Sequence, residues 1–203
     1  MITSLRESRY LVPLSIYALI IIAIVAMKLF IPWPYVTSVA ALLMLSVPIF
    51  TGTGSSALRW DLRGVIIGII VSVVLLLIYT GAIALIGLYT NKSLSFRMLS
   101  YTFILVQLLL VALPEEVFFR GYLQNKLGNN LKGVIIVSLL FAIGHFITLC
   151  LGGNHNLSLC SQAILTFFPS LVMGYLYLTT GTLWASILFH FLANVVHIAI
   201  GLS

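Results

Sequence analysis

Long apolar runs separated by short polar breaks make up almost the whole chain. A membrane-spanning helix needs about 20 predominantly apolar residues, and most of the runs reach or approach that length. The runs cover residues 10–31, 34–50, 64–89, 98–125, 133–151, 159–178 and 181–202. The pattern predicts about seven spans, within a range of about six to eight because the run 34–50 is short.

Residues that disfavour helices mark the breaks between the runs. Pro32 and Pro34 separate the first two runs, and the longest polar stretch is 51–63. The other predicted loops are 91–97, 128–132, 152–158 and 179–181. His155 falls in one of them and is expected to be a loop or interface residue.

The composition supports a fold that faces lipid. Hydrophobic residues make up 62% of the chain and charged residues only 7%, whereas about a quarter of a soluble domain is charged. We therefore expect an all-α polytopic transmembrane helical bundle. Residues 1–203 are expected to form a single integral membrane domain, with the active-site core in 98–203.

The basic residues indicate an orientation in the membrane. They lie near the ends of the apolar runs rather than in one cluster, so no nucleic-acid partner is expected. With the N-terminus in the cytoplasm, the inner segments carry Arg6, Arg9, Arg59, Arg63, Lys126 and Lys132, and the outer segments carry Lys28, Lys92 and Arg97. The positive-inside rule then predicts a multi-pass protein of the cell membrane with a cytoplasmic N-terminus.

The chain has two cysteines, Cys150 and Cys160, which flank the predicted loop 152–158. Two cysteines are too few for a disulfide scaffold. A single bridge is one reading, and the favoured reading is two small apolar residues at helix ends.

An acidic pair in an apolar run is the first sign of chemistry. Glu115 and Glu116 follow Pro114, and an acid at the centre of a membrane helix costs roughly 2.5–3.5 kcal/mol. Arg120 lies one helical turn after Glu116, so these two are expected to pair and to support the site. Glu115 is left as the acid that can act as a general base.

Histidines deep in other spans point to the same site. His145 and His190 lie in separate apolar runs, and Asn194 shares a helix face with His190. Measured along each helix from its cytoplasmic end, the depth is roughly 16 Å for Glu115, 20 Å for His145, 14 Å for His190 and 20 Å for Asn194. Three helices thus bring their polar groups to one layer of the membrane.

These residues lie in three motifs, P-E-E-V-F-F-R at 114–120, F-A-I-G-H at 141–145 and H-F-L-A-N at 190–194. In order and spacing they resemble the E-E-x-x-x-R, F-x-x-x-H and H-x-x-x-N motifs of the CPBP intramembrane proteases. That family includes the type II CAAX prenyl endopeptidases and the bacteriocin-processing or self-immunity (Abi) proteins. The resemblance implies a peptide hydrolase whose substrate is a membrane-embedded or lipidated protein or peptide in the lipid bilayer.

The resemblance also implies roles for the residues. Glu115 would activate a water molecule with the help of His145, while His190 and Asn194 would stabilise the oxyanion. Glu116 and Arg120 match the second Glu and the Arg of the first motif. No cofactor is expected in this scheme.

Two alternatives stay open. In a zinc-dependent protease, Glu115, Glu116, His145 and His190 would be the metal ligands, although the sequence lacks an H-E-x-x-H motif. A non-enzymatic bacteriocin-immunity or carrier protein is the other alternative, but the chain lacks the internal repeat typical of carriers.

Overall fold

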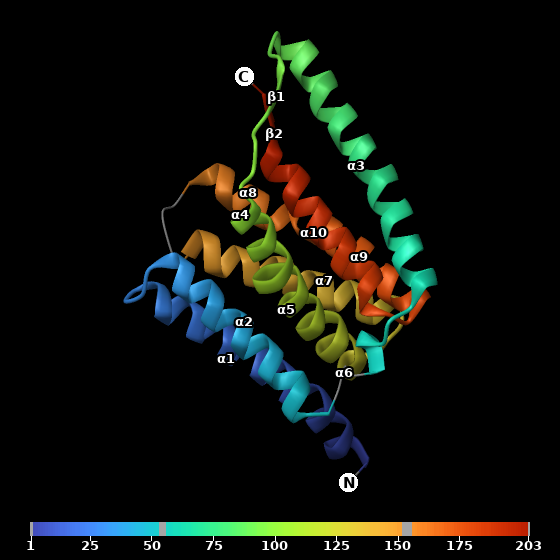
Figure 1. Cartoon of the computed structure of the whole chain (residues 1–203). Helices are drawn as coiled ribbons and strands as arrows, with labels where there is room; N and C mark the ends of the chain where they lie inside the picture. Colours follow the sequence, from blue (N-terminus) through green and yellow to red (C-terminus); the bar gives the residue numbers. More distant parts are fainter. Residues whose placement is uncertain (1, 53–55, 152–155, 203) are drawn as a thin grey trace.

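The computed structural model describes residues 2–52, 56–151 and 156–202, most of which are helical (Figure 1). In chain order, the elements are α1 (Ile2–Lys28), α2 (Trp33–Phe50), η1 (Ser56–Leu58), α3 (Leu62–Thr90), β1 (Leu94–Phe96), α4 (Tyr101–Val106), η2 (Gln107–Ala112), α5 (Leu113–Glu116), η3 (Val117–Gln124), α6 (Asn125–Leu127), α7 (Leu131–Phe146), η4 (Ile147–Leu151), α8 (Leu157–Leu165), α9 (Phe167–Thr180), α10 (Leu183–Ala199) and β2 (Ile200–Leu202). Element η1 is a 3-10 turn, and η2, η3 and η4 are π-helical.

Each predicted apolar run corresponds to a helical stretch. Among the described residues, six stretches are long and apolar enough to cross a membrane: Tyr10–Lys28, Trp33–Phe50, Leu62–Thr90, Tyr101–Leu127, Leu131–Cys150 and Leu157–Thr180. The last apolar helix, α10, is shorter, with 17 residues. The prediction of an all-α polytopic transmembrane bundle is confirmed.

Polar residues at the predicted breaks begin and end the helices. The Asp61 carboxylate caps α3 by accepting from the backbone N–H groups of Arg63 and Gly64. Asn91 ends the same helix in the left-handed conformation, with φ of 54°, which asparagine tolerates better than most residues. Such caps satisfy backbone groups that a helix end leaves without partners.

Helix α10 links α3 to the central helices of the bundle. In Figure 1 the pair α1–α2 lies on one side and α3 on the other, with α7, α9, α10 and the segment from α4 to α6 between them. Helix α10 packs against α3, α9 and η2. Only 6% of the apolar window of α3 is buried, which is the exposure expected of a helix whose outer face contacts lipid.

The structure corrects the predicted end of the last span. Residues 200–202 were placed in the run 181–202, but they form β2, which pairs antiparallel with β1 in the predicted loop 91–97. The backbone of Ile200 is extended, with φ of −104° and ψ of 133°. Pairing with β1 gives the backbone groups beyond the end of α10 partners that a free helix end lacks.

The favoured reading of the cysteines is also wrong. Cys150 and Cys160 form a disulfide, with their Cα atoms 5.1 Å apart, a separation in the usual range for such bridges. The bridge joins the end of η4 to α8. The sequence placed the cysteines at two helix ends but could not show that these ends come within bonding distance.

Helices α3 and α10 approach closely at Gly68. An alanine at Gly68 and an alanine at Gly81 should therefore change the free energy of unfolding in opposite directions. A Cβ atom at Gly68 would lie 2.8 Å from the Cα of Ala185, whereas a Cβ at Gly81 of the same helix meets nothing within 4 Å. We expect Gly68→Ala to lower the free energy of unfolding by about 1–3 kcal/mol through overpacking. Gly81→Ala should raise it by up to ~1 kcal/mol because alanine favours the helix.

Thermal unfolding of the two variants in one detergent checks this prediction. Equal midpoints for both variants would show that α3 and α10 do not pack through Gly68.

Candidate active site

The motif residues lie close together in the middle of the bundle, although they come from three helices. Glu115 lies on α5, His145 on α7 and His190 on α10. The Glu115 oxygen Oε2 lies 4.0 Å from Nε2 of His145 and 3.8 Å from Nε2 of His190. The common depth estimated from the sequence thus corresponds to one cluster of side chains.

The helix that carries the two acids is widened around Pro114. Proline has no backbone N–H, so the carbonyl one turn earlier loses its usual partner. In the structure α5, which contains Pro114, lies between the π-helical segments η2 and η3. The N–H of Leu113 bonds to the carbonyl of Leu108, five residues earlier. Such π-helical turns occur frequently at functional sites.

The predicted ion pair between Glu116 and Arg120 is confirmed. Nη1 of Arg120 donates to Oε1 of Glu116 at 3.0 Å, and both side chains are fully buried. Nη2 of Arg120 donates to the hydroxyl and to the carbonyl of Ser170, at 2.7 and 3.0 Å. A buried ion pair needs such additional hydrogen bonds to offset its desolvation, and Ser170 anchors this one to α9.

Glu116 also orients the ring of His190. Nδ1 of His190 lies 2.9 Å from Oε1 of Glu116. A carboxylate paired with a guanidinium can only accept, so Nδ1 is the donor and carries a proton. In the neutral ring, Nε2 then has no proton and presents its lone pair toward Glu115.

His145 is held in the same tautomer by a different group. Its Nδ1 lies 3.0 Å from the carbonyl oxygen of Phe141, which can only accept, so Nδ1 again carries the proton. The ring stacks on Phe141 with centroids 4.3 Å apart. Two imidazole Nε2 atoms and the Glu115 carboxylate therefore face one another as acceptors. This arrangement favours a hydrogen-bond donor or a cation among them.

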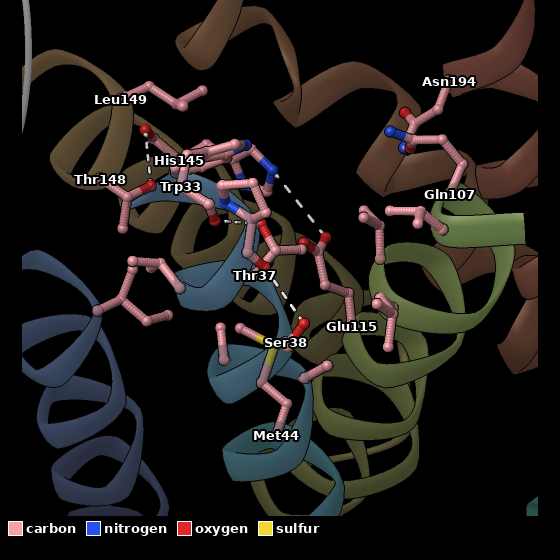
Figure 2. Close-up of a pocket in the computed structure, with 18 of the residues that line it drawn as sticks. Trp33, Thr37, Ser38, Met44, Gln107, Glu115, His145, Thr148, Leu149 and Asn194 are labelled. Carbon is pink, nitrogen blue, oxygen red and sulfur yellow. Dashed lines mark hydrogen bonds and ion pairs between the residues drawn. The ribbon is translucent and has the colours of Figure 1, made fainter. Parts of the chain in front are cut away.

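Asn194 has a partner that the sequence analysis missed. Its Nδ2 donates to Oε1 of Gln107 at 3.1 Å, and Figure 2 shows the two side chains together at one edge of the site. Gln107 is a polar residue inside the apolar run 98–125, a signal that could have drawn attention to it. Ser170 gave no comparable signal, because serine is common in membrane helices.

Two cavities lie on either side of the motif residues. The larger, about 660 Å³, is lined by Glu115, His145 and Asn194 together with residues of α1, α2 and α4 (Figure 2). The smaller, about 480 Å³, is lined by His145, His190 and Asn194 together with residues of α3, α8 and α9. His145 and Asn194 border both cavities, so the motif layer separates two mainly apolar spaces.

His197 is not part of the cluster. His197 lies on the wall of the smaller cavity, where its Nδ1 is 2.6 Å from the hydroxyl oxygen of Tyr79. His155, predicted as a loop or interface residue, lies outside the described residues.

The fold and site define a polytopic membrane protein with a partly buried Glu–His cluster that borders two cavities. Within this class, the sequence model of the family "Type II CAAX prenyl endopeptidase Rce1-like" matches residues 97–196. The matched segment contains all three motifs, and it belongs to this family, as their resemblance predicts. The family supports a membrane-embedded protease, that is, a peptide hydrolase. Comparisons with curated proteins and with solved structures gave no match.

Because the Glu116–Arg120 pair is buried, Arg120→Ala is predicted to destabilise the folded protein strongly. This change leaves a buried carboxylate without its main partner, which typically costs about 3–5 kcal/mol. We expect less folded protein and a lower unfolding midpoint in detergent. The matched control is Glu116→Gln/Arg120→Met, which removes both charges and should recover part of the loss. An unchanged midpoint for Arg120→Ala would contradict a stabilising ion pair.

Proposed function

We propose that the protein is an intramembrane endopeptidase that hydrolyses a peptide bond of a membrane-embedded or lipidated protein or peptide. The observation that carries this proposal is the convergence of Glu115, His145 and His190 inside a segment of the endopeptidase family. The separations of 3.8 and 4.0 Å are too long for direct hydrogen bonds. They suit one water molecule bonded to these side chains.

Glu115 is the proposed general base. It has no cationic partner on its own helix, because Arg120 pairs with Glu116. Its carboxylate takes a proton from the water as the water oxygen attacks the scissile carbonyl carbon. His145 accepts the second hydrogen bond of the water through Nε2 and so orients the attack. The C–N bond then breaks, and Glu115 passes the proton to the leaving nitrogen.

His190 and Asn194 are the proposed donors to the oxyanion. His190 already donates from Nδ1 to Glu116, so it can donate from Nε2 only when the ring carries both protons. Asn194 uses one N–H for Gln107, and its second N–H is available to the oxyanion. Donors fixed in advance toward developing charge are an effective way to lower a barrier.

A zinc-dependent protease is the second candidate, and the facing Nε2 lone pairs favour it. A histidine whose other nitrogen donates to a carboxylate, as His190 does to Glu116, is common in zinc sites. With bonds of 2.0–2.1 Å, tetrahedral zinc would hold two ligand atoms roughly 3.4 Å apart. The observed 3.8 and 4.0 Å are somewhat longer, and among the described residues no group of three His, Cys, Asp or Glu is close enough to hold a metal.

If Glu115 is the general base, Glu115→Gln should abolish proteolysis without lowering the amount of protein in the membrane. General-base catalysis contributes about 10²–10⁴ in rate, and glutamine keeps the shape of the side chain but takes no proton. Mass spectrometry of membrane and secreted peptides from cells with wild type or variant would reveal the uncleaved substrate. An immunoblot of the membrane fraction controls for insertion. Unchanged peptide profiles would contradict the proposed role.

Elemental analysis of the purified protein distinguishes the metal-free mechanism from the zinc-dependent one. We expect active, purified protein to contain no stoichiometric zinc and to retain its turnover in a strong chelator. His190→Gln should then keep partial activity, since an amide can still donate, with a loss of about 10²–10³ for an impaired oxyanion donor. Zinc whose removal abolishes turnover and whose return restores it would overturn the metal-free mechanism.

A further inference from the structure

The helix that carries Glu115 has a further polar residue to which the catalytic scheme gives no role of its own. Gln107 lies eight residues before Glu115, at the start of η2, and both side chains line the larger cavity. In a regular α-helix this spacing would place them about 80° apart around the helix axis. A π-helical turn takes up one additional residue, which reduces this angle to about 20°. The widening of the helix around Pro114 therefore turns Gln107 toward the cavity that contains Glu115.

The amide of Gln107 has one clear partner. A polar group inside a membrane span is costly when it lacks a hydrogen bond. Gln107 is half-buried, and its Oε1 accepts from Nδ2 of Asn194 at 3.1 Å. Within residues 2–52, 56–151 and 156–202, no other side-chain hydrogen bond reaches either amide. In Figure 2 the two amides lie together at one edge of the cavity that Glu115 and His145 also line.

Asn194 depends on this contact for the orientation of its amide. The terminal torsion of an asparagine side chain is broad, so its own rotamer does not decide which way the amide faces. The oxygen and the nitrogen of an amide are similar in shape, and hydrogen bonds distinguish the two orientations. An acceptor at Oε1 of Gln107 selects the orientation in which Nδ2 faces it. The second N–H of Nδ2 is then held in a fixed position.

We propose that Gln107 is a positioning residue for peptide hydrolysis: its Oε1 holds the Asn194 amide in the orientation that directs an N–H to the developing oxyanion. The inference rests on the proposed peptidase function, in which Asn194 is an oxyanion donor. Gln107 acts through Asn194, because a donor fixed in advance needs no reorientation as negative charge develops. The contact therefore lowers the barrier to turnover and has little influence on substrate binding.

Two substitutions separate the acceptor from the rest of the side chain. Gln107→Met keeps the length of the side chain but removes the amide, and an apolar side chain favours membrane insertion. Gln107→Glu keeps an oxygen that accepts from Asn194, whether the carboxyl group is ionised or protonated. Leu109→Met on the same helix is the control, since Leu109 is 51% exposed and lines neither cavity. Unfolding midpoints in detergent show whether each variant is folded.

Steady-state kinetics measure the effect. Wild type and variants are incubated in detergent with a synthetic library of apolar peptides, and mass spectrometry identifies the cleaved peptides, one of which then serves as the probe. We expect Gln107→Met to lower kcat by about 10- to 100-fold with little change in KM, a smaller loss than the ~10²–10³ for removal of an oxyanion donor. Gln107→Glu should recover most of the lost kcat, and Leu109→Met should match wild type.

A double-mutant cycle tests whether Gln107 acts through Asn194. In the Asn194→Ala background, Gln107→Met should have no further effect on kcat, because no amide is left to orient. If the two losses multiply instead, Gln107 contributes independently of Asn194 and the proposal is overturned.

Two other results would also overturn the proposal while the peptidase function stands. One is a loss in Gln107→Met that appears as a higher KM at unchanged kcat, which would assign Gln107 to substrate binding. The other is a folded Gln107→Glu variant whose kcat is no higher than that of Gln107→Met. Wild type that cleaves no peptide of the library would count against the peptidase function and, with it, the positioning role.

Discussion

The buried carboxylate of Glu116 is the contact on which the rest of the site depends. One of its oxygens accepts from both Arg120 and His190, and Arg120 reaches on to Ser170. These hydrogen bonds join the helix of the first motif to α9 and α10 in a place where water cannot substitute for a missing partner. In a bundle whose helices meet mainly through apolar side chains, they help to fix how the three helices are rotated relative to one another.

That arrangement explains why two adjacent acids have different surroundings. Neighbouring residues on a helix point about 100° apart, so Glu116 enters the core while Glu115 lies on the wall of the larger cavity. Glu116 has a guanidinium and an imidazole as partners, whereas the Glu115 oxygen Oε2 faces the two Nε2 atoms at 3.8 and 4.0 Å, without a direct hydrogen bond. The same helix thus supplies one carboxylate that organises the site and one that is available to react.

The surroundings of the cluster also suit a substrate from the membrane. Both cavities are mainly apolar and are bordered by His145 and Asn194, so an apolar peptide in either cavity can contact the motif residues. The bridge between Cys150 and Cys160 joins η4 to α8 close to this region. It limits how far the segments that border the two cavities can separate at this end of the bundle.

The sequence by itself determined the spans, the three motifs and the ion pair of Glu116 with Arg120. These features follow from local rules: the length of an apolar run, the depth of a residue along its helix, and the side chains that meet one turn apart. Only the tertiary structure decided the tautomers of His145 and His190, the contact of Asn194 with Gln107, the disulfide, the strand pair β1–β2 and the course of the cavities. Each of these depends on which helix faces meet and at what angle. That outcome is set by the packing of many side chains far apart in sequence, and it leaves no periodic signal in the sequence.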